Sequence, residues 1–250
     1  FSISTIDDSI SDINETIDIN LKPNGGDLTF CKNTLSSQTI TIVDNEAAPT
    51  ITLAASASSI AENAGSSITL TATSSIVSGS DITVSFDTSG TATEGTDYGS
   101  ITDITISAGS TTGTTTFTPT DDSMYETSTD ETATVAIDTV SGGSATENGT
   151  QSVTITINEN ESAPTVTLAA SATSIAENAG SSITITASLS GTTSQDVTVS
   201  LSSSSTATEG TDYGTVSDIT ISSGSTSGTA TFTPTDDSIY DATSNETAIL

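Results

Sequence analysis

The chain has 250 residues and carries 32 aspartates and glutamates, two lysines and no arginine or histidine, which gives a formal charge of −30. Nucleic acids and anionic membrane surfaces are therefore poor partners, because binding to either requires a basic patch. The absence of histidine excludes a three-histidine zinc site and a histidine general base. Cys31 is the single cysteine, so no intrachain disulfide can form.

Apolar and polar residues alternate in seven short stretches between residues 50 and 157, which is the period of a β-strand. The predicted strands span residues 50–53, 67–73, 82–86, 101–106, 114–118, 132–140 and 152–157. No stretch has helical periodicity or the roughly 20 apolar residues of a membrane-spanning helix. About seven strands with glycine-rich turns between them predict an all-β fold, an antiparallel two-sheet sandwich of the immunoglobulin type.

Three motifs recur with one spacing. Ala-Pro-Thr begins at positions 48 and 163, Ala-Glu-Asn-Ala-Gly at 61 and 176, and Thr-Glu-Gly-Thr-Asp-Tyr at 93 and 208. The spacing of 115 residues (163 − 48) is the size of a whole domain. We therefore expect tandem sandwiches: the C-terminal part of one domain at 1–47, a complete domain at 48–162 and the N-terminal part of a third at 163–250. Because the chain begins at Phe1 with sequence typical of the middle of a domain, we expect a longer protein around it.

An acidic segment recurs with the repeats. Residues 121–131 hold five carboxylates and no lysine or arginine, residues 236–246 repeat the pattern, and residues 5–16 form a looser copy. The predicted exits from the last strands, 44–46 and 158–161, are acidic as well. Carboxylates packed this closely repel one another unless a cation lies among them. The chain supplies almost no positive charge, so we expect an ion from outside.

In this order, the markers Ala-Glu-Asn-Ala-Gly, Thr-Glu-Gly-Thr-Asp-Tyr and Phe-Thr-Pro-Thr-Asp-Asp-Ser, closed by the strand exit Ile-x-Glu-Asn-Glu, resemble the Calx-beta domain. The resemblance covers residues 48–162 from end to end and the partial domains as far as they run. Domains of this family are immunoglobulin-like sandwiches that occur in the regulatory part of sodium–calcium exchangers, in integrin β4 and in large bacterial surface proteins. Several bind Ca²⁺ at one end of the sandwich, which implies calcium sites here.

The resemblance implies a set of ligands at the end of each domain. In the complete domain these positions are Glu62, Asp97, Asp121, Asp122, Glu126, Glu131, Asn158, Glu159, Asn160 and Glu161. In the first domain they are Asp7, Asp8, Asp12, Glu15, Asp44 and Glu46, and in the third Glu177, Asp212, Asp236, Asp237, Asp241 and Glu246. The family has a run of aspartates after the final strand. Here amides and glutamates replace some of them, which leaves the number of ions per site open.

The chemistry of the donors agrees with calcium. Ca²⁺ takes about six to eight oxygen ligands in flexible geometry, whereas Mg²⁺ demands a tighter octahedron and soft metals prefer ligands that are absent here. A solvated acidic surface is the simplest alternative, but its acids would not gather at the same positions of each repeat. A catalytic carboxylate pair of the glycosidase type is disfavoured by the absence of tryptophan, and we expect no enzyme. Glu94 and Glu209 are expected to be surface residues. Tyr98, Tyr125, Tyr213 and Tyr240 are expected to pack in the domains.

Together these inferences predict a secreted or cell-surface structural protein. Ca²⁺ at the domain ends would rigidify a rod-like stalk, filament or matrix fibre, as in an adhesin. The expected partners are calcium ions and other copies of the chain in a filament or lateral assembly, without nucleic acid or membrane insertion. The alternative is a calcium-sensing regulatory module of a membrane transporter. A secretion signal or anchor in the full-length protein would favour the first function, and transmembrane helices would favour the second.

Overall fold

The computed structural model describes residues 2–20, 37–126, 130–204, 206–237 and 246–249. The regular elements in these residues are β-strands, β1 to β20, and none of the described residues forms a helix long and apolar enough to cross a membrane. This confirms the predicted all-β class. The chain divides into two compact units: the first comprises Phe1–Thr120 and Glu131–Asn158, and the second Asp121–Asp130 and Glu159–Leu250.

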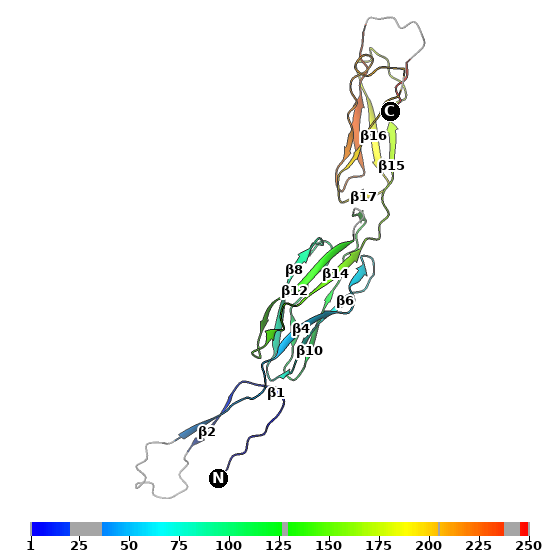
Figure 1. Ribbon diagram of the computed structural model, residues 1–250. Coiled ribbons are helices and arrows are strands. Elements are labelled where there is room, and N and C mark those ends of the chain that lie inside the picture. Colours follow the sequence, from blue (N-terminus) through cyan, green and yellow to red (C-terminus); the bar gives the residue numbers. More distant parts are fainter. Residues whose placement is uncertain (1, 21–36, 127–129, 205, 238–245, 250) are drawn as a thin grey trace, which may run out of the picture. The chain divides into compact units, whose positions relative to one another are not determined.

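The first unit contains a sandwich of two sheets, with strand orders β10-β6-β4-β13 and β5-β14-β12-β8-β9 (Figure 1). The strands of the first sheet are β4 (Thr50–Ala55), β6 (Ile68–Ser74), β10 (Thr112–Phe117) and β13 (Thr146–Glu147). Those of the second are β5 (Ser59–Ala61), β8 (Ile82–Gly90), β9 (Ile104–Ile106), β12 (Glu131–Ser141) and β14 (Ser152–Asn158). Neighbours pair antiparallel, except that β5 and β13 pair in parallel with β14 and β4. The predicted immunoglobulin-like sandwich is confirmed.

All seven predicted strands of this domain are present. The prediction at 101–106 was too long, because the strand begins only at Ile104. The short strands β5, β13 and β7 (Val77–Ser78) were not predicted, since two or three residues carry no measurable alternation.

Alternation explains why these segments form strands and where the core lies. In β6, buried Ile68, Leu70 and Ala72 alternate with threonines on the outer face. The core is aliphatic apart from one aromatic pair: Tyr98 stacks on Phe117 with ring centroids 4.7 Å apart. The predicted packing role of Tyr98 therefore holds, and Tyr213 in the second unit is equally buried.

Residues 2–20 and 37–47 add three strands to the first unit. β1 (Ile10–Ser11) pairs in parallel with β7, and β2 (Glu15–Asn20) pairs antiparallel with β3 (Ser37–Ile42). Glu15 lies opposite Ile42, as Glu131 lies opposite Ile157 between β12 and β14, so the pair has the register expected for the end of a repeat. That residues 1–47 belong to a separate sandwich stays a prediction. Cys31 and the two lysines fall outside the described residues.

The second unit repeats half of this plan. β15 (Val166–Ala170), β16 (Ile183–Leu189) and β20 (Ser227–Phe232) form one antiparallel sheet. Two further pairs join β18 (Val197–Val199) to β19 (Ile219–Ile221) and β11 (Met124–Tyr125) to β17 (Thr192–Thr193). In β15, Val166 is 45% and Leu168 43% exposed, whereas the equivalent Ile51 and Leu53 of β4 are buried. The described residues of the second unit contain no counterpart of β12 or β14, the strands whose side chains share the core with β4.

Candidate metal centre

Glu62 is held at the end of β14 by the turn that follows β5. Its N–H donates to the carbonyl oxygen of Asn158 at 3.1 Å, because β5 runs parallel to the last residues of β14. Gly65 closes the turn with φ +59°, a conformation that glycine adopts without strain. The Glu62 side chain is only 8% exposed, which is rare for a glutamate.

Asp97 is positioned by the buried Tyr98 that follows it. Tyr98 forms a β-bridge with Pro119, and the N–H of Thr120 donates to the carbonyl oxygen of Asp97 at 2.9 Å. The Asp97 carboxylate accepts the N–H of Thr93 at 2.6 Å, which closes its own loop. Core packing therefore fixes the loop of Asp97 against Thr120, the last residue of the first unit before the acidic segment.

Four predicted ligands of the first unit gather at one end of its sandwich. Asp97 and Glu131 each offer a carboxylate oxygen within 4.8 Å of the other. Glu131 pairs with Ile157 next to Asn158, which in turn holds Glu62. The chain leaves this end of the first unit after Thr120, returns to it at Glu131 and leaves it again after Asn158. Each of these residues is joined to an acidic residue of the second unit.

A second acidic group lies in the second unit and is centred on Glu159. Its carboxylate accepts the N–H of Glu126 at 2.6 Å and the N–H of Glu161 at 2.8 Å. The side-chain amide of Asn160 donates to Glu161 Oε1 at 2.8 Å. The other oxygen, Glu161 Oε2, is buried and has no hydrogen-bond partner. A buried acceptor without a donor is costly, so this oxygen is a place where a cation would be stabilising.

The pKa values of this group reflect its crowding. When Glu161 is protonated it donates a hydrogen bond to the Glu159 side chain. This bond, followed by burial and by the charges of Glu159, Asp121 and Asp122, raises the pKa of Glu161 above its ordinary value of 4.5. Burial acts to raise the pKa of Glu159 too, but the hydrogen bonds that its carboxylate accepts outweigh burial and the net pKa is lowered. The pair therefore holds a proton preferentially on Glu161.

We predict that Glu161→Gln flattens the pH dependence of stability without calcium. The stabilisation from protonated Glu161 is complete below its unfolded pKa of 4.5 and is lost as the pH rises through its raised folded pKa. Glu159 has a lowered folded pKa, so its own contribution is lost only as the pH falls below 4.5. Between pH 4.5 and neutrality, urea unfolding in a chelator should show stability of the second unit falling with pH in the wild type and falling less in the variant. Equal slopes in both proteins, or flattening by the control Glu94→Gln, would contradict the assignment.

The same arrangement recurs in the N-terminal copy. A hydrogen bond with Asp44, then burial and the charges of Asp44 and Asp7, raise the pKa of Glu46. Two predicted ligands, Asp7 and Asp44, therefore act on a third, Glu46. By repeat position Asp7, Asp44 and Glu46 correspond to Asp121, Glu159 and Glu161. Asp8 has another role, since its carboxylate accepts the N–H of Ile10 at 2.9 Å.

Two further predicted ligands of the N-terminal copy lie on or near its strands. The Asp12 carboxylate lies directly against Gly79, where a Cβ would collide with it. Glu15 is exposed on β2, in the register that Glu131 has on β12.

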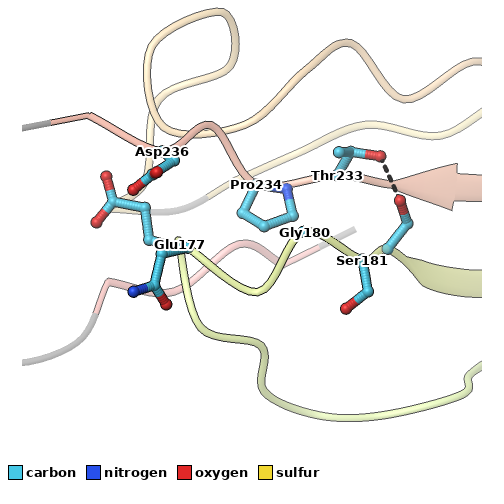
Figure 2. A pocket seen from close by; sticks show the side chains of 8 residues that line it. Glu177, Gly180, Ser181, Thr233, Pro234 and Asp236 are labelled. Carbon is cyan, nitrogen blue, oxygen red and sulfur yellow. Dashed lines mark hydrogen bonds between the residues drawn. The ribbon is translucent and has the colours of Figure 1, made fainter.

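The third copy presents an open version of the site (Figure 2). A cavity of about 220 Å³ is lined by eight residues, including Glu177, Gly180, Pro234 and Asp236. Glu177 accepts the N–H of Asp237 at 3.1 Å, and Figure 2 shows Glu177 and Asp236 at the end of the cavity away from Thr233. Unlike Glu62, Glu177 is exposed.

Three further predicted ligands belong to this copy. The Asp212 carboxylate accepts the N–H of Thr208 at 2.6 Å, repeating the loop of Asp97. Glu246 precedes Thr247, whose carbonyl oxygen accepts the N–H of Thr206, just as Glu131 precedes Thr132 beside Thr91. Asp241 falls outside the described residues.

Comparison with protein families decides the relationship of the chain. The model of the Calx-beta domain matches residues 44–161 and again residues 159–250. The chain belongs to the Calx-beta domain family. Its two Calx-beta matches lie in tandem, as the repeat of 115 residues predicted, and no curated protein sequence matches the chain.

Solved structures with similar folds include Calx-beta proteins. The apo form of the Calx CBD1 domain is 18% identical, over 45% of this chain and 99% of that chain, with a TM-score of 0.38. The CBD12 of CALX1.2 is 18% identical, over 72% of this chain and 73% of that chain, with a TM-score of 0.36. Invasin, a bacterial integrin-binding protein, is 18% identical, over 79% of this chain and 37% of that chain, with a TM-score of 0.31.

Proposed function

We propose that the chain binds Ca²⁺ through the acidic groups of its repeats and has no catalytic role. The observation that carries this proposal is Glu161 Oε2, a buried oxygen without a hydrogen-bond partner. The charges of Glu159, Asp121 and Asp122 act on the same side chain. In a chain with two lysines and no arginine, a cation from solution is the available source of compensation.

The donors favour calcium over other cations. Carboxylate and amide oxygens are hard ligands, and Ca²⁺ accepts many of them at irregular positions, whereas Mg²⁺ needs a compact octahedron and retains water. Soft metals require thiolate or imidazole, and the sequence has one cysteine and no histidine. The carboxylates of Asp97 and Glu131, within 4.8 Å of each other, provide further hard donors in the first unit.

For the biological role we propose a structural repeat of a secreted or cell-surface protein. Short acidic junctions and successive repeats of nearly identical sequence suit a stalk, filament or matrix fibre, including an adhesin, in which calcium stiffens each junction. Other copies of the chain are proposed partners in such an assembly. The alternative is a calcium-sensing regulatory module of a membrane transporter. It is favoured by the pairing of the acidic segment with β17, through which bound calcium could act on a neighbouring element.

Calorimetric titration of the chain with CaCl₂ and with MgCl₂ tests the proposal. We expect Ca²⁺ to bind and Mg²⁺ to bind at least about tenfold more weakly. Glu161→Gln should remove one class of calcium sites, whereas Glu94→Gln should leave the titration unchanged because Glu94 is exposed and outside the acidic groups. Absence of calcium heat, or equal losses in both variants, would refute calcium binding at this site. Small-angle scattering of the same samples tests stiffening: an unchanged radius of gyration on adding Ca²⁺ would remove the mechanical role.

A further inference from the structure

A two-residue parallel strand pair occurs twice, at equivalent places in the repeats. β1 (Ile10–Ser11) pairs with β7 (Val77–Ser78), and β11 (Met124–Tyr125) pairs with β17 (Thr192–Thr193). The first pair lies inside the first unit and the second inside the second unit. In both pairs one strand comes from the acidic segment of a sequence repeat and the other from the repeat that follows it in the chain.

The two pairs share the same hydrogen bonds. The N–H of Gly79 donates to Ser11 O at 3.0 Å, and the N–H of Ser194 donates to Tyr125 O at 3.1 Å. The strand that accepts these bonds is shaped by an aspartate in both cases. Asp8 accepts the N–H of Ile10 at 2.9 Å, and Asp122 accepts the N–H of Met124 at 2.6 Å.

The pairing depends on the main chain more than on side chains. Both acidic segments contain Asp-Asp-Ser, but the two residues that follow and form the strand are Ile-Ser in one and Met-Tyr in the other. Their partner strands differ as well, since residues 77–79 are Val-Ser-Gly and residues 192–194 are Thr-Thr-Ser. Identical geometry on different side chains is typical of strand addition to an exposed edge. Ser78 of β7 and Thr193 of β17 are both buried.

We propose that the two residues after Asp-Asp-Ser, Ile10–Ser11 in one acidic segment and Met124–Tyr125 in the other, are docking strands whose partners are β7 and β17 of the next repeat, and that a bound divalent cation strengthens this docking. The second half rests on the proposed calcium function. Asp122 shapes the accepting strand β11, while the charges of Asp121 and Asp122 also act on Glu161. A cation among these carboxylates removes the repulsion that pushes the segment away from Glu159 and Glu161, and so holds it ready for pairing.

Amide hydrogen exchange measured by NMR on the whole chain tests the docking directly. Without calcium, the Gly79 and Ser194 amides should exchange about tenfold or more slowly than unstructured amides. Added calcium should slow their exchange further. In Asp121→Asn/Asp122→Asn the asparagine oxygens still accept the same N–H, so only the charge changes. Ser194 should then lose its response to calcium while Gly79, which pairs with the other segment, keeps it. Asp7→Asn/Asp8→Asn should give the reciprocal result.

Thr192→Val provides a matched side-chain control. It removes the hydroxyl that donates to Ser123 O at 3.2 Å and restores the valine found at the equivalent Val77, so protection of Ser194 should persist. Free exchange of Gly79 and Ser194 in the wild type would overturn the docking segment. If calorimetry shows calcium binding but calcium does not change the exchange rates of Gly79 and Ser194, the proposed coupling between calcium and docking is overturned. If calorimetry shows no calcium binding, the proposed function and the coupling fail together, and protected Gly79 and Ser194 amides would still support the docking.

Discussion

Replacing Phe117 by alanine is expected to lower the free energy of unfolding of the first unit by about 3–5 kcal/mol. Phe117 is fully buried and stacks on Tyr98, so alanine leaves a cavity beside a second aromatic ring. The surrounding core is aliphatic and close-packed, which limits how far it can collapse into that cavity. This is among the largest effects that a single core substitution should have in this chain.

The same substitution should disturb the candidate site, because Tyr98 holds the loop of Asp97. Urea unfolding followed by circular dichroism should show an early transition for the first unit and an unchanged transition for the second. Phe232→Ala is the matched control, since Phe232 stacks on Tyr213 at 4.8 Å but is half-buried and should cost less. Loss of less than about 1 kcal/mol in Phe117→Ala would contradict the assignment of this pair as the centre of the core.

Asp121→Asn/Asp122→Asn is expected to change stability in opposite directions with and without calcium. In a chelator the variant should be more stable than the wild type, because two charges that act on Glu161 are gone. With free Ca²⁺ about 100-fold above the dissociation constant, each bound ion stabilises the wild type by about 2.7 kcal/mol, and the variant loses this for each site that it abolishes. The order of the two proteins therefore reverses when calcium is added.

Thermal unfolding of both proteins in EGTA and in CaCl₂ measures this reversal. The control Asp103→Asn/Asp138→Asn removes the same charge from exposed positions on and beside the strands of the first unit, and it should keep the full calcium response. If the wild type has the same melting temperature in EGTA and in CaCl₂, stabilisation by calcium is refuted. A control that behaves like the Asp121/Asp122 variant would assign the effect to net charge.

The long strands were predictable from the sequence because each repeats its alternation over enough residues to exceed chance. Leu70 and Val135, for example, are buried as their positions in the pattern require. The docking strands were not predicted, since Met124–Tyr125 and Thr192–Thr193 pair through tertiary contacts that no local pattern records. For the same reason the sequence could not assign residues 121–130 to the second unit.

The site was predictable in composition but not in geometry. Motif positions placed Asp7, Asp44 and Glu46 in one group, and the charges of Asp7 and Asp44 do act on Glu46. Asp12 satisfied the same spacing yet lies against Gly79, because the strand pairing of Ile10–Ser11 fixes the chain there. Identical Glu-Asn motifs also differ in burial, with Glu62 buried and Glu177 exposed. Burial depends on which strands surround the turn, and the motif does not encode them.

The assignment of residues 121–130 to the second unit has a consequence for biosynthesis. A ribosome completes β12 and β14 before it makes β17, so the first sandwich can close while β11 still lacks its pairing partner. During that interval the acidic segment is joined at both ends to finished strands but has no strand of its own to pair with. The acidic segment therefore finds its pairing strand only when the next repeat emerges, and in an array of such repeats this pairing would form one domain behind the point of synthesis.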